Sequence, residues 1–357
     1  MRAFRTSMAV VATVALMAGA CGGGADATDT TTGDDGTPDT PGPSPEAVTM
    51  GYFANVTHTP AIVGVTEGFF QEELGETELR TLTFNAGTEA VEALFNEAID
   101  MTFIGPNPAI NGYAQSDGEA LRIIAGTTSG GAALVVNGAI QSVEDLAGKS
   151  LATPSLGNTQ DVAARAWLAA QGFGVTLEGG GEVNVVPQPN AETLEAFRAG
   201  TVQAAWSPEP WATRLVLEGG GHVLVDEKDL WPDGQFVTTH LIVATAFLEE
   251  HPDVVDAVLR GLVRSMEFVN TDPAAAQAAV NTNIEAITGS AIAPETITGA
   301  WSNLEFTLDP IASSLQKSAD DAEAAGLLDP VDLDGIYALD RLNAILAELG
   351  MEEVSSA

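Results

Sequence analysis

Polar side chains collect in a short segment that follows the first long apolar run after residue 45. Asn55, Thr57 and His58 come directly after residues 48–53, and Pro60 then favours the start of a helix. The first N–H groups of a helix lack partners, so an amide, a hydroxyl and an imidazole beside them can bind a polar ligand. The alternative is routine capping of the helix by Thr57. We predict that Asn55, Thr57 and His58 contact a ligand.

Two further polar segments occupy the same kind of position. Asn107 lies in the Gly-Pro-Asn-Pro segment 105–108, whose glycine and prolines fix a turn and let another molecule approach the backbone. Thr128 lies in segment 126–131, where three hydroxyls between glycines can donate hydrogen bonds to an oxyanion. The alternatives are a plain turn capped by Asn107 and a hinge loop that needs its glycines for their backbone angles.

The second half of the chain repeats the pattern. Ser155, Asn158 and Thr159 lie between the apolar run 150–153 and a helical pattern that starts near residue 159. Free N–H groups and the helix dipole favour an anion at such a helix start. Capping by Ser155 or Asn158 is compatible with this role, because capping and ligand contact can use different groups.

Aromatic and charged groups surround a proline-rich turn at residues 206–211. There Glu209 could bind an amine and Trp211 could form a flat wall for a ligand, although tryptophan packing is the plainer interpretation. His240 lies near the predicted return of the chain to its first half. His58 and His240 could face one cleft, which leaves a weak metal hypothesis, but a lone histidine is more often a structural residue. We expect neither a metal nor a cofactor.

The elements that must position these turns alternate between strand and helix from residue 48 onward. The expected strands are 48–53, 79–84, 101–104, 121–125, 132–136, 150–153, 183–186, 203–206, 222–225 and 238–244. The expected helices are 59–68, 88–97, 159–171, 191–199, 210–218, 252–270, 273–286, 294–303, 310–325 and 336–349. This alternation predicts an α/β fold with parallel-rich sheets flanked by helices.

The order of elements divides the chain into two lobes. We expect residues 48–130 and 238–350 to form the first lobe and residues 138–232 the second. The chain would then cross between the lobes twice, which makes a hinge with a cleft between them. Ligands bind beyond the carboxyl ends of strands in such sheets, which is where the polar turns lie.

The net charge is strongly negative. The 357 residues include 13 Lys and Arg against 50 Asp and Glu, a formal charge of −37. Nucleic acids and anionic membrane surfaces are therefore excluded as electrostatic partners. The acidic residues are spread over nearly every expected helix and form no calcium-loop motif, so we interpret them as a solvated surface.

The N-terminus has the features of an export signal. Two arginines precede the apolar run 8–20, and residues 1–20 are predicted to be a signal peptide. Cys21 is the single cysteine, and residues 21–46, which contain no large apolar groups, are predicted to be a disordered tether. The segment 16–21 resembles a lipobox, so we expect a lipid on Cys21 and an extracytoplasmic protein anchored to the cell membrane. Cleavage at Ala18–Ala20 by an ordinary signal peptidase is the alternative.

Several of these segments together resemble a known family. They are GYFANVTHTPA at 51–61, EGFF at 67–70, VEDLAGK at 143–149 and EPWA at 209–212. They are similar to the solute-binding proteins of the nitrate/sulfonate/taurine ABC importers. The resemblance implies a two-lobed periplasmic-binding-protein-like fold of type II that captures a small organic solute, sulfonate-like or taurine-like, for a membrane permease. It also implies a pocket built from the corresponding turns, and we expect a monomer.

Other functions remain open at this point. Relatives that bind a thiamine-precursor pyrimidine, nitrate or bicarbonate have the same resemblance, and a sensor domain would use the same binding chemistry. An enzyme on the same fold is less favoured. The body lacks a cysteine nucleophile, and no G-x-S-x-G segment occurs.

Overall fold

A computed structural model describes residues 45–356. The predicted signal peptide, Cys21 and nearly all of the predicted tether lie outside the described residues. The strands are β1 Ala47–Phe53, β2 Glu78–Phe84, β3 Met101–Ile104, β4 Leu121–Gly130, β5 Ala132–Val136, β6 Ser150–Thr153, β7 Asn184–Pro187, β8 Ala204–Pro208, β9 His222–Asp226, β10 Val237–Ala244 and β11 Leu304–Phe306.

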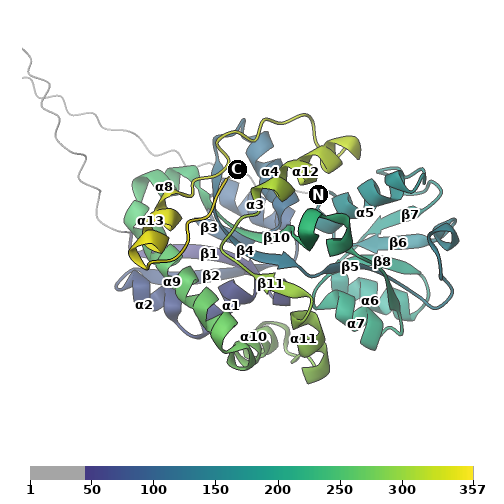
Figure 1. Cartoon of the computed structure of the whole chain (residues 1–357), viewed down its shortest axis with the longest axis horizontal. Coiled ribbons are helices and arrows are strands. Elements are labelled where there is room, and N and C mark those ends of the chain that lie inside the picture. The colour runs from purple at the N-terminus through teal and green to yellow at the C-terminus, as the bar shows by residue number, and fades with distance from the viewer. Residues whose placement is uncertain (1–44, 357) are drawn as a thin grey trace, which may run out of the picture. The chain divides into compact units, whose positions relative to one another are not determined.

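Helices connect most of these strands (Figure 1). The α-helices are α1 Thr59–Thr66, α2 Phe69–Leu74, α3 Gly87–Phe95, α4 Pro106–Gln115, α5 Thr159–Ala170, α6 Asn190–Arg198, α7 Trp211–Leu217, α8 Thr245–Glu250, α9 Pro252–Thr271, α10 Pro273–Thr288, α11 Pro294–Trp301, α12 Ala312–Ala324 and α13 Asp340–Glu348. Short 3₁₀ helices are η1 Val56–His58, η2 Val143–Leu146, η3 Glu227–Leu230 and η4 Pro232–Gly234.

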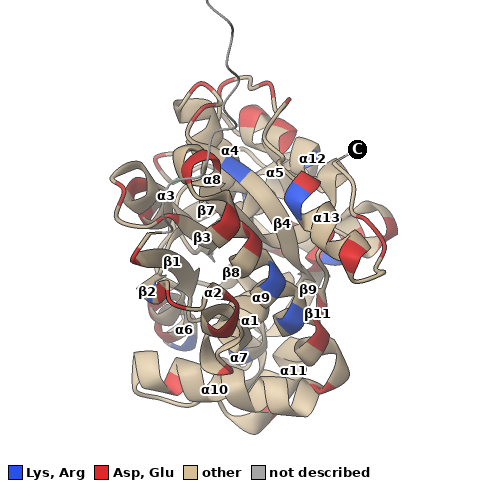
Figure 2. Ribbon diagram, turned by 90° about the vertical axis from the view of Figure 1, so that its left-hand side faces the viewer, with Lys and Arg blue, Asp and Glu red and all other residues tan. Residues whose placement is uncertain are grey.

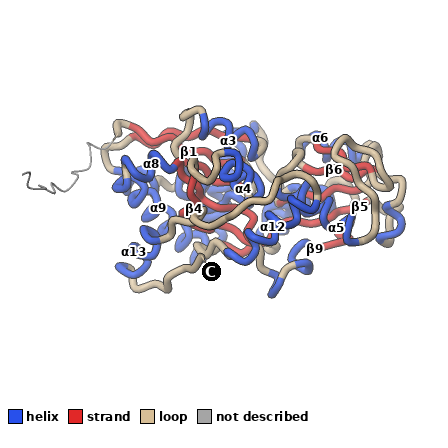
Figure 3. Tube along the Cα trace, turned by 90° about the horizontal axis from the view of Figure 1, so that it is seen from above, coloured by secondary structure: helices blue, strands red, loops and turns tan. Residues whose placement is uncertain are grey.

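The strands form two separate mixed sheets. The larger sheet has the order β11-β4-β10-β3-β1-β2, and the smaller one has the order β7-β6-β8-β5-β9. Strands β1, β2 and β3 run parallel, as do β6, β7 and β8, whereas β10 and β5 run antiparallel to their neighbours. Figure 3 shows the two sets of strands and the helices that cover them. The predicted α/β class with two helix-flanked sheets is confirmed.

The chain crosses between the sheets at two points. The first crossing joins β4 to β5 at Gly130 and Gly131, whose φ angles of 77° and 72° lie in the region that glycine adopts readily. The second crossing runs from β9 through η3 and η4 to β10. The strands of the larger sheet come from residues 47–130 and 237–306, and those of the smaller from 132–226. The boundaries of the two lobes remain a prediction.

The longest described helix shows how the sequence pattern produces the packing. Helix α9 buries Val254, Val258 and Leu262, which recur every fourth residue along one face. This face packs against α1 and α2 beside the larger sheet. A Cβ atom at Gly64 would lie only 2.2 Å from the ring of Phe70, so the close approach of these helices requires glycine there.

Several local predictions were wrong. Residues 106–115 form helix α4 where a plain turn was expected, because Pro106 suits the first helical position. Residues 126–130 continue β4 instead of forming a loop, since they pair with β10 and β11. Helices α2 and α8 and strand β11 were missed, and α13 begins at Asp340 rather than near residue 336.

Acidic residues are spread over the described part of the chain. Figure 2 shows Asp and Glu on many helices and loops rather than on one element. Among residues 45–356 no helix combines the length and the apolar character that crossing a membrane requires.

Candidate ligand-binding site

A pocket lies where the carboxyl ends of strands from both sheets meet. Its walls follow β1, β2 and β3 on one side and β6, β7 and β8 on the other. Its volume is about 40 Å³. The lining residues are Phe53, Asn55, Thr57, His58, Asn85, Ala86, Gly87, Gly105, Pro108, Pro154, Asn158, Thr159, Gln160, Asn190, Pro208 and Thr238.

Helix starts converge on this pocket. Its lining includes the residues at or next to the first turn of α1, α3, α4, α5 and α6. The N-terminus of a helix carries a partial positive charge and N–H groups without helical partners. No Lys, Arg, Asp or Glu lines the pocket. The arrangement can therefore hold an anionic group through helix ends and neutral donors.

His58 contributes an uncharged ring to the site. Its side chain is buried, and Nδ1 accepts a hydrogen bond from the Phe53 N–H at 3.4 Å while the two rings stack. Burial lowers the pKa of His58 to about 3. The imidazole is thus neutral at physiological pH and supplies no positive charge to a ligand.

Asn55 links the pocket to the helices of the smaller sheet. Its Oδ1 accepts a hydrogen bond of 3.1 Å from Nε1 of Trp211, the first residue of α7. The backbone of Asn55 is also fixed, because its N–H donates to Phe53 and its carbonyl accepts from His58. Trp211 itself lies outside the pocket lining and reaches the site through Asn55.

A buried carboxylate holds the turn that carries Asn158 and Thr159. Asp161 accepts hydrogen bonds from the Thr153 hydroxyl at 2.6 Å, the Gly157 N–H at 2.9 Å and Nε of Arg165 at 2.9 Å. Its own N–H donates to Asn158 Oδ1, which caps α5. Asp161 and Arg165 are both fully buried. This network gives α5 a fixed start at the pocket wall.

Five of the eleven predicted binding residues line the pocket, and six do not. Those that line it are Asn55, Thr57, His58, Asn158 and Thr159. Those outside its lining are Asn107, Thr128, Ser155, Glu209, Trp211 and His240.

Three of the outside residues hold backbone carbonyls. Nδ2 of Asn107 donates to Ser318 at 2.9 Å, and the hydroxyl of Thr128 donates to Thr57 at 2.7 Å. Nε2 of His240 lies 3.1 Å from the carbonyl of Pro310. Burial lowers the pKa of His240 to about 4, although its hydrogen bond with the Pro310 carbonyl acts in the opposite direction and raises it. Of these three, Thr128 alone bonds to a residue that lines the pocket, Thr57.

Glu209 and Ser155 are also outside the pocket lining. Glu209 lines a different cavity of about 380 Å³ between α7 and α11, together with Thr213 and Asn303. Pro208, the preceding residue, lines the ligand pocket, so the two consecutive side chains point in different directions. The hydroxyl of Ser155 is buried without a hydrogen-bond partner among the described residues.

Sequence reasoning missed four polar lining residues, namely Asn85, Gln160, Asn190 and Thr238. Asn85 and Asn190 follow β2 and β7, so the rule that drew attention to the other turns would have found them. Asn190 has a buried Oδ1 without a described partner. Among residues 45–356 no group of three His, Cys, Asp or Glu side chains could hold a metal ion.

Comparison with known proteins gives a family for this architecture. The model of the NMT1-like family matches residues 41–284. This chain belongs to the NMT1-like family. Among family relatives, the taurine-binding periplasmic protein of Escherichia coli K12 is 27% identical over 228 residues, which is 63% of this chain and 67% of that protein. The putative aliphatic sulfonates-binding protein of the same organism is 26% identical over 60% of this chain and 65% of its own length.

Solved structures agree on the fold of this NMT1-like chain. The alkanesulfonate-binding protein SsuA from Xanthomonas axonopodis pv. citri, bound to MOPS, superposes with a TM-score of 0.67 at 20% identity, covering 81% of this chain and 96% of that one. The nitrate-binding protein NrtA from Synechocystis PCC 6803 gives 0.68 at 15% identity, covering 85% and 89%. The expected periplasmic-binding-protein fold is confirmed.

Proposed function

We propose that this chain is the extracytoplasmic solute-binding component of an ABC importer and captures a small organic solute, sulfonate-like or taurine-like, that carries an anionic group. The pocket between the sheets supports this most directly, because helix starts surround it and no acidic or basic side chain lines it. Fixed N–H dipoles can hold a sulfonate without a counter-charge. Its curated relatives include taurine-binding and putative sulfonates-binding proteins.

The small volume of the pocket is consistent with a site that closes on its ligand. Pockets for small molecules usually occupy about 300–1,000 Å³, whereas this one has about 40 Å³. Within residues 45–356 the chain crosses between the two sheets twice, which allows hinge motion between them. Entry and release of the solute would require the sheets to move apart.

Nitrate or bicarbonate is an alternative ligand, since relatives include a nitrate-binding protein and the bicarbonate-binding protein CmpA. The pyrimidine and sensor alternatives have no comparable support. We propose no catalytic role for this pocket, which no Lys, Arg, Asp or Glu lines. The permease is the proposed partner of the closed, loaded protein.

A thermal-shift screen tests the proposed function. Taurine, ethanesulfonate, nitrate, bicarbonate and a hydroxymethylpyrimidine are added to the whole chain, and a ligand that binds only the folded state raises the melting temperature. We expect the sulfonates to give the largest shift. A shift with none of the five solutes would refute the proposal.

The site is tested with matched threonine variants. Thr159→Val removes a pocket hydroxyl with little change in shape, and should weaken binding of the best solute about tenfold. Thr282→Val on the exposed face of α10 is the control and should bind normally. If the two variants bind the solute with equal affinity, the ligand does not contact the hydroxyl of Thr159 and the proposed site is wrong.

The proposed lipid anchor is separate from the binding site. Cys21 would carry the lipid and residues 21–46 would tether the binding protein close to its permease, which raises its local concentration there. Cys21→Ser should move the protein from the membrane fraction to the soluble fraction. If the distribution stays the same, the anchor is not on Cys21.

A further inference from the structure

Trp211 and Asn55 form one polar link between the elements that follow the larger sheet and those that follow the smaller. Trp211 starts α7 beside the smaller sheet, and Asn55 follows β1 of the larger sheet. The indole Nε1 donates to Asn55 Oδ1 at 3.1 Å. Asn55 also lines the ligand pocket. The side chain of Asn55 therefore lines the pocket and also bonds to the first residue of α7.

The chemistry of the indole fixes the orientation of the amide. The Nε1–H group of tryptophan is a donor only, so the Asn55 atom that faces it must be the oxygen. The Nδ2 group then carries the two hydrogens away from Trp211. Among the described residues Nδ2 makes no hydrogen bond, and the backbone N–H and carbonyl of Asn55 are already paired. The two N–H groups of Nδ2 can therefore donate to a ligand.

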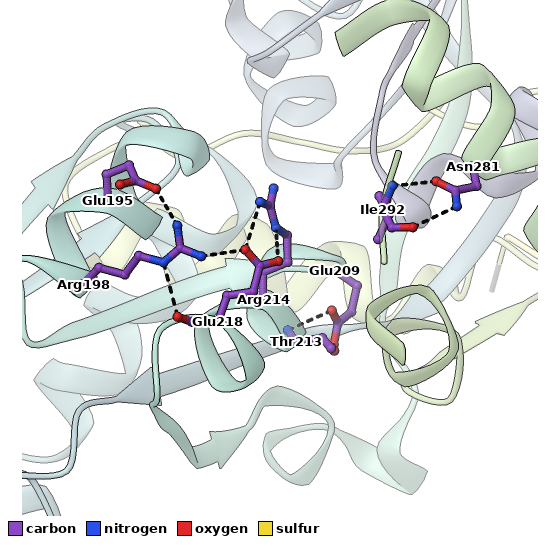
Figure 4. Close-up of polar contacts among 8 residues, drawn as sticks. All are labelled: Glu195, Arg198, Glu209, Thr213, Arg214, Glu218, Asn281 and Ile292. Atoms are coloured by element: carbon purple, nitrogen blue, oxygen red, sulfur yellow. Dashed lines mark hydrogen bonds and ion pairs between the residues drawn. The ribbon is translucent and has the colours of Figure 1, made fainter. Parts of the chain in front are cut away.

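The ring of Trp211 is itself held in place. The guanidinium of Arg214 lies over it, 4.7 Å from the ring centroid. Nε of Arg214 donates a hydrogen bond of 2.7 Å to the carboxylate of Glu218. The same carboxylate accepts a hydrogen bond of 2.7 Å from Nη2 of Arg198 (Figure 4). These contacts hold the guanidinium of Arg214 against the indole and so restrict the ring of Trp211.

We propose that Trp211 is a positioning residue that latches the two sheets together and turns the Asn55 amide so that Nδ2 donates to the anionic group of the solute. The part of this proposal in which Asn55 donates to a solute rests on the proposed function. The part in which Trp211 holds the two sheets together does not. Closure and anion recognition are coupled, because Trp211 reaches Asn55 only when the sheets are together.

Two variants separate the roles of latch and donor. Asn55→Asp keeps an acceptor for the Trp211 N–H but presents a carboxylate to the pocket, so ethanesulfonate binding should weaken at least about a hundredfold. Trp211→Phe keeps an aromatic ring under Arg214 but removes the N–H. It should speed release of ethanesulfonate about tenfold and change the association rate little. Trp301→Phe, on α11, is the matched control and should change neither rate.

The latch is also measured without any ligand. In the proton–nitrogen correlation spectrum of the whole chain, Trp211→Phe identifies the Trp211 indole signal. Asn55→Leu should shift that signal toward the position of a free indole, and Asn55→Asp should leave it hydrogen-bonded. An unchanged signal in Asn55→Leu refutes the latch. Should the wild type bind ethanesulfonate and Asn55→Asp bind it equally well, the donor role of Asn55 is refuted.

The proposal and the proposed function fail in different ways. If the wild type binds none of the screened solutes, the proposed function fails while the indole signal still decides the latch. If ethanesulfonate binds but Trp211→Phe releases it at the wild-type rate, the function stands and the latch is wrong. Melting curves of each variant are the control that checks whether the variant still folds.

Discussion

Glu209 and Asn303 join the helices beside the two sheets. Oε1 of Glu209 accepts a hydrogen bond from Nδ2 of Asn303 at 2.7 Å. Thr213 donates to the same carboxylate through its N–H and its hydroxyl, and Figure 4 shows Glu209 beside Thr213. Burial raises the pKa of Glu209, and these donors partly offset the effect. The contact lies in the cavity between α7 and α11, away from the ligand pocket.

Removal of this carboxylate should destabilise the fold. Glu209→Ala leaves the Thr213 N–H and the Asn303 amide without their acceptor, and we expect a loss of about 2–4 kcal/mol in the free energy of unfolding. Urea unfolding measures this loss. Glu249→Ala, at an exposed position on α8, should change it by less than about 0.5 kcal/mol. A double-mutant cycle with Asn303→Ala should show coupling, and simple additivity would contradict the contact.

The Asp161–Arg165 pair should affect both stability and binding. Arg165→Met leaves a buried carboxylate without its cation, and we expect a loss of about 3–5 kcal/mol in the free energy of unfolding. Because Asp161 also holds the Gly157 N–H at the turn beside Asn158, solute affinity measured below the melting temperature should fall as well. Arg80→Met, which breaks an exposed pair, is the control and should leave both quantities unchanged.

Glu227 should give the stability a dependence on pH. Its side chain is fully buried, one oxygen accepts from the Trp206 indole at 2.6 Å, and burial raises its pKa to about 7. The native state therefore binds a proton between pH 4.5 and 7 that the unfolded chain releases. This group stabilises the fold fully below pH 4.5, and its contribution is lost as the pH rises to 7.

Glu227→Gln tests this dependence, since the amide keeps an acceptor for Trp206 but carries no charge. The variant should gain on the order of 2–3 kcal/mol relative to the wild type between pH 4.5 and pH 8. Urea unfolding at several pH values gives the comparison. Parallel curves for the variant and the wild type would mean that Glu227 does not titrate in this range.

Salt should accelerate the binding of anions. A formal charge of −37 repels an anionic solute, and the Debye length falls from about 30 Å at 0.01 M to about 8 Å at 0.15 M ionic strength. Stopped-flow measurements should show a several-fold faster association of ethanesulfonate at the higher salt. Taurine, a zwitterion without net charge, serves as the control and should show little change. Equal responses of the two solutes would contradict long-range repulsion.

Local sequence patterns were sufficient for the class of fold and for part of the site. A strand that is followed by a polar turn and a helix start can be recognised within a few residues, as at Asn55 and Asn158. Helix α4 was missed because Gly105 and Pro106 read as a turn, although proline also suits a first helical turn. The same local rule, applied to β2 and β7, would have added Asn85 and Asn190.

The sequence by itself determined the alternation of strands and helices, the acidic surface and the turns that could form a site. Only the tertiary structure decided which side chains face the pocket. Pro208 and Glu209 are neighbours, yet they line different cavities, because consecutive side chains at a strand end point in different directions. Thr128 donates to Thr57 across 71 residues, and Trp211 reaches Asn55 across 156. Such partners depend on how the two sheets come together, which no local pattern specifies.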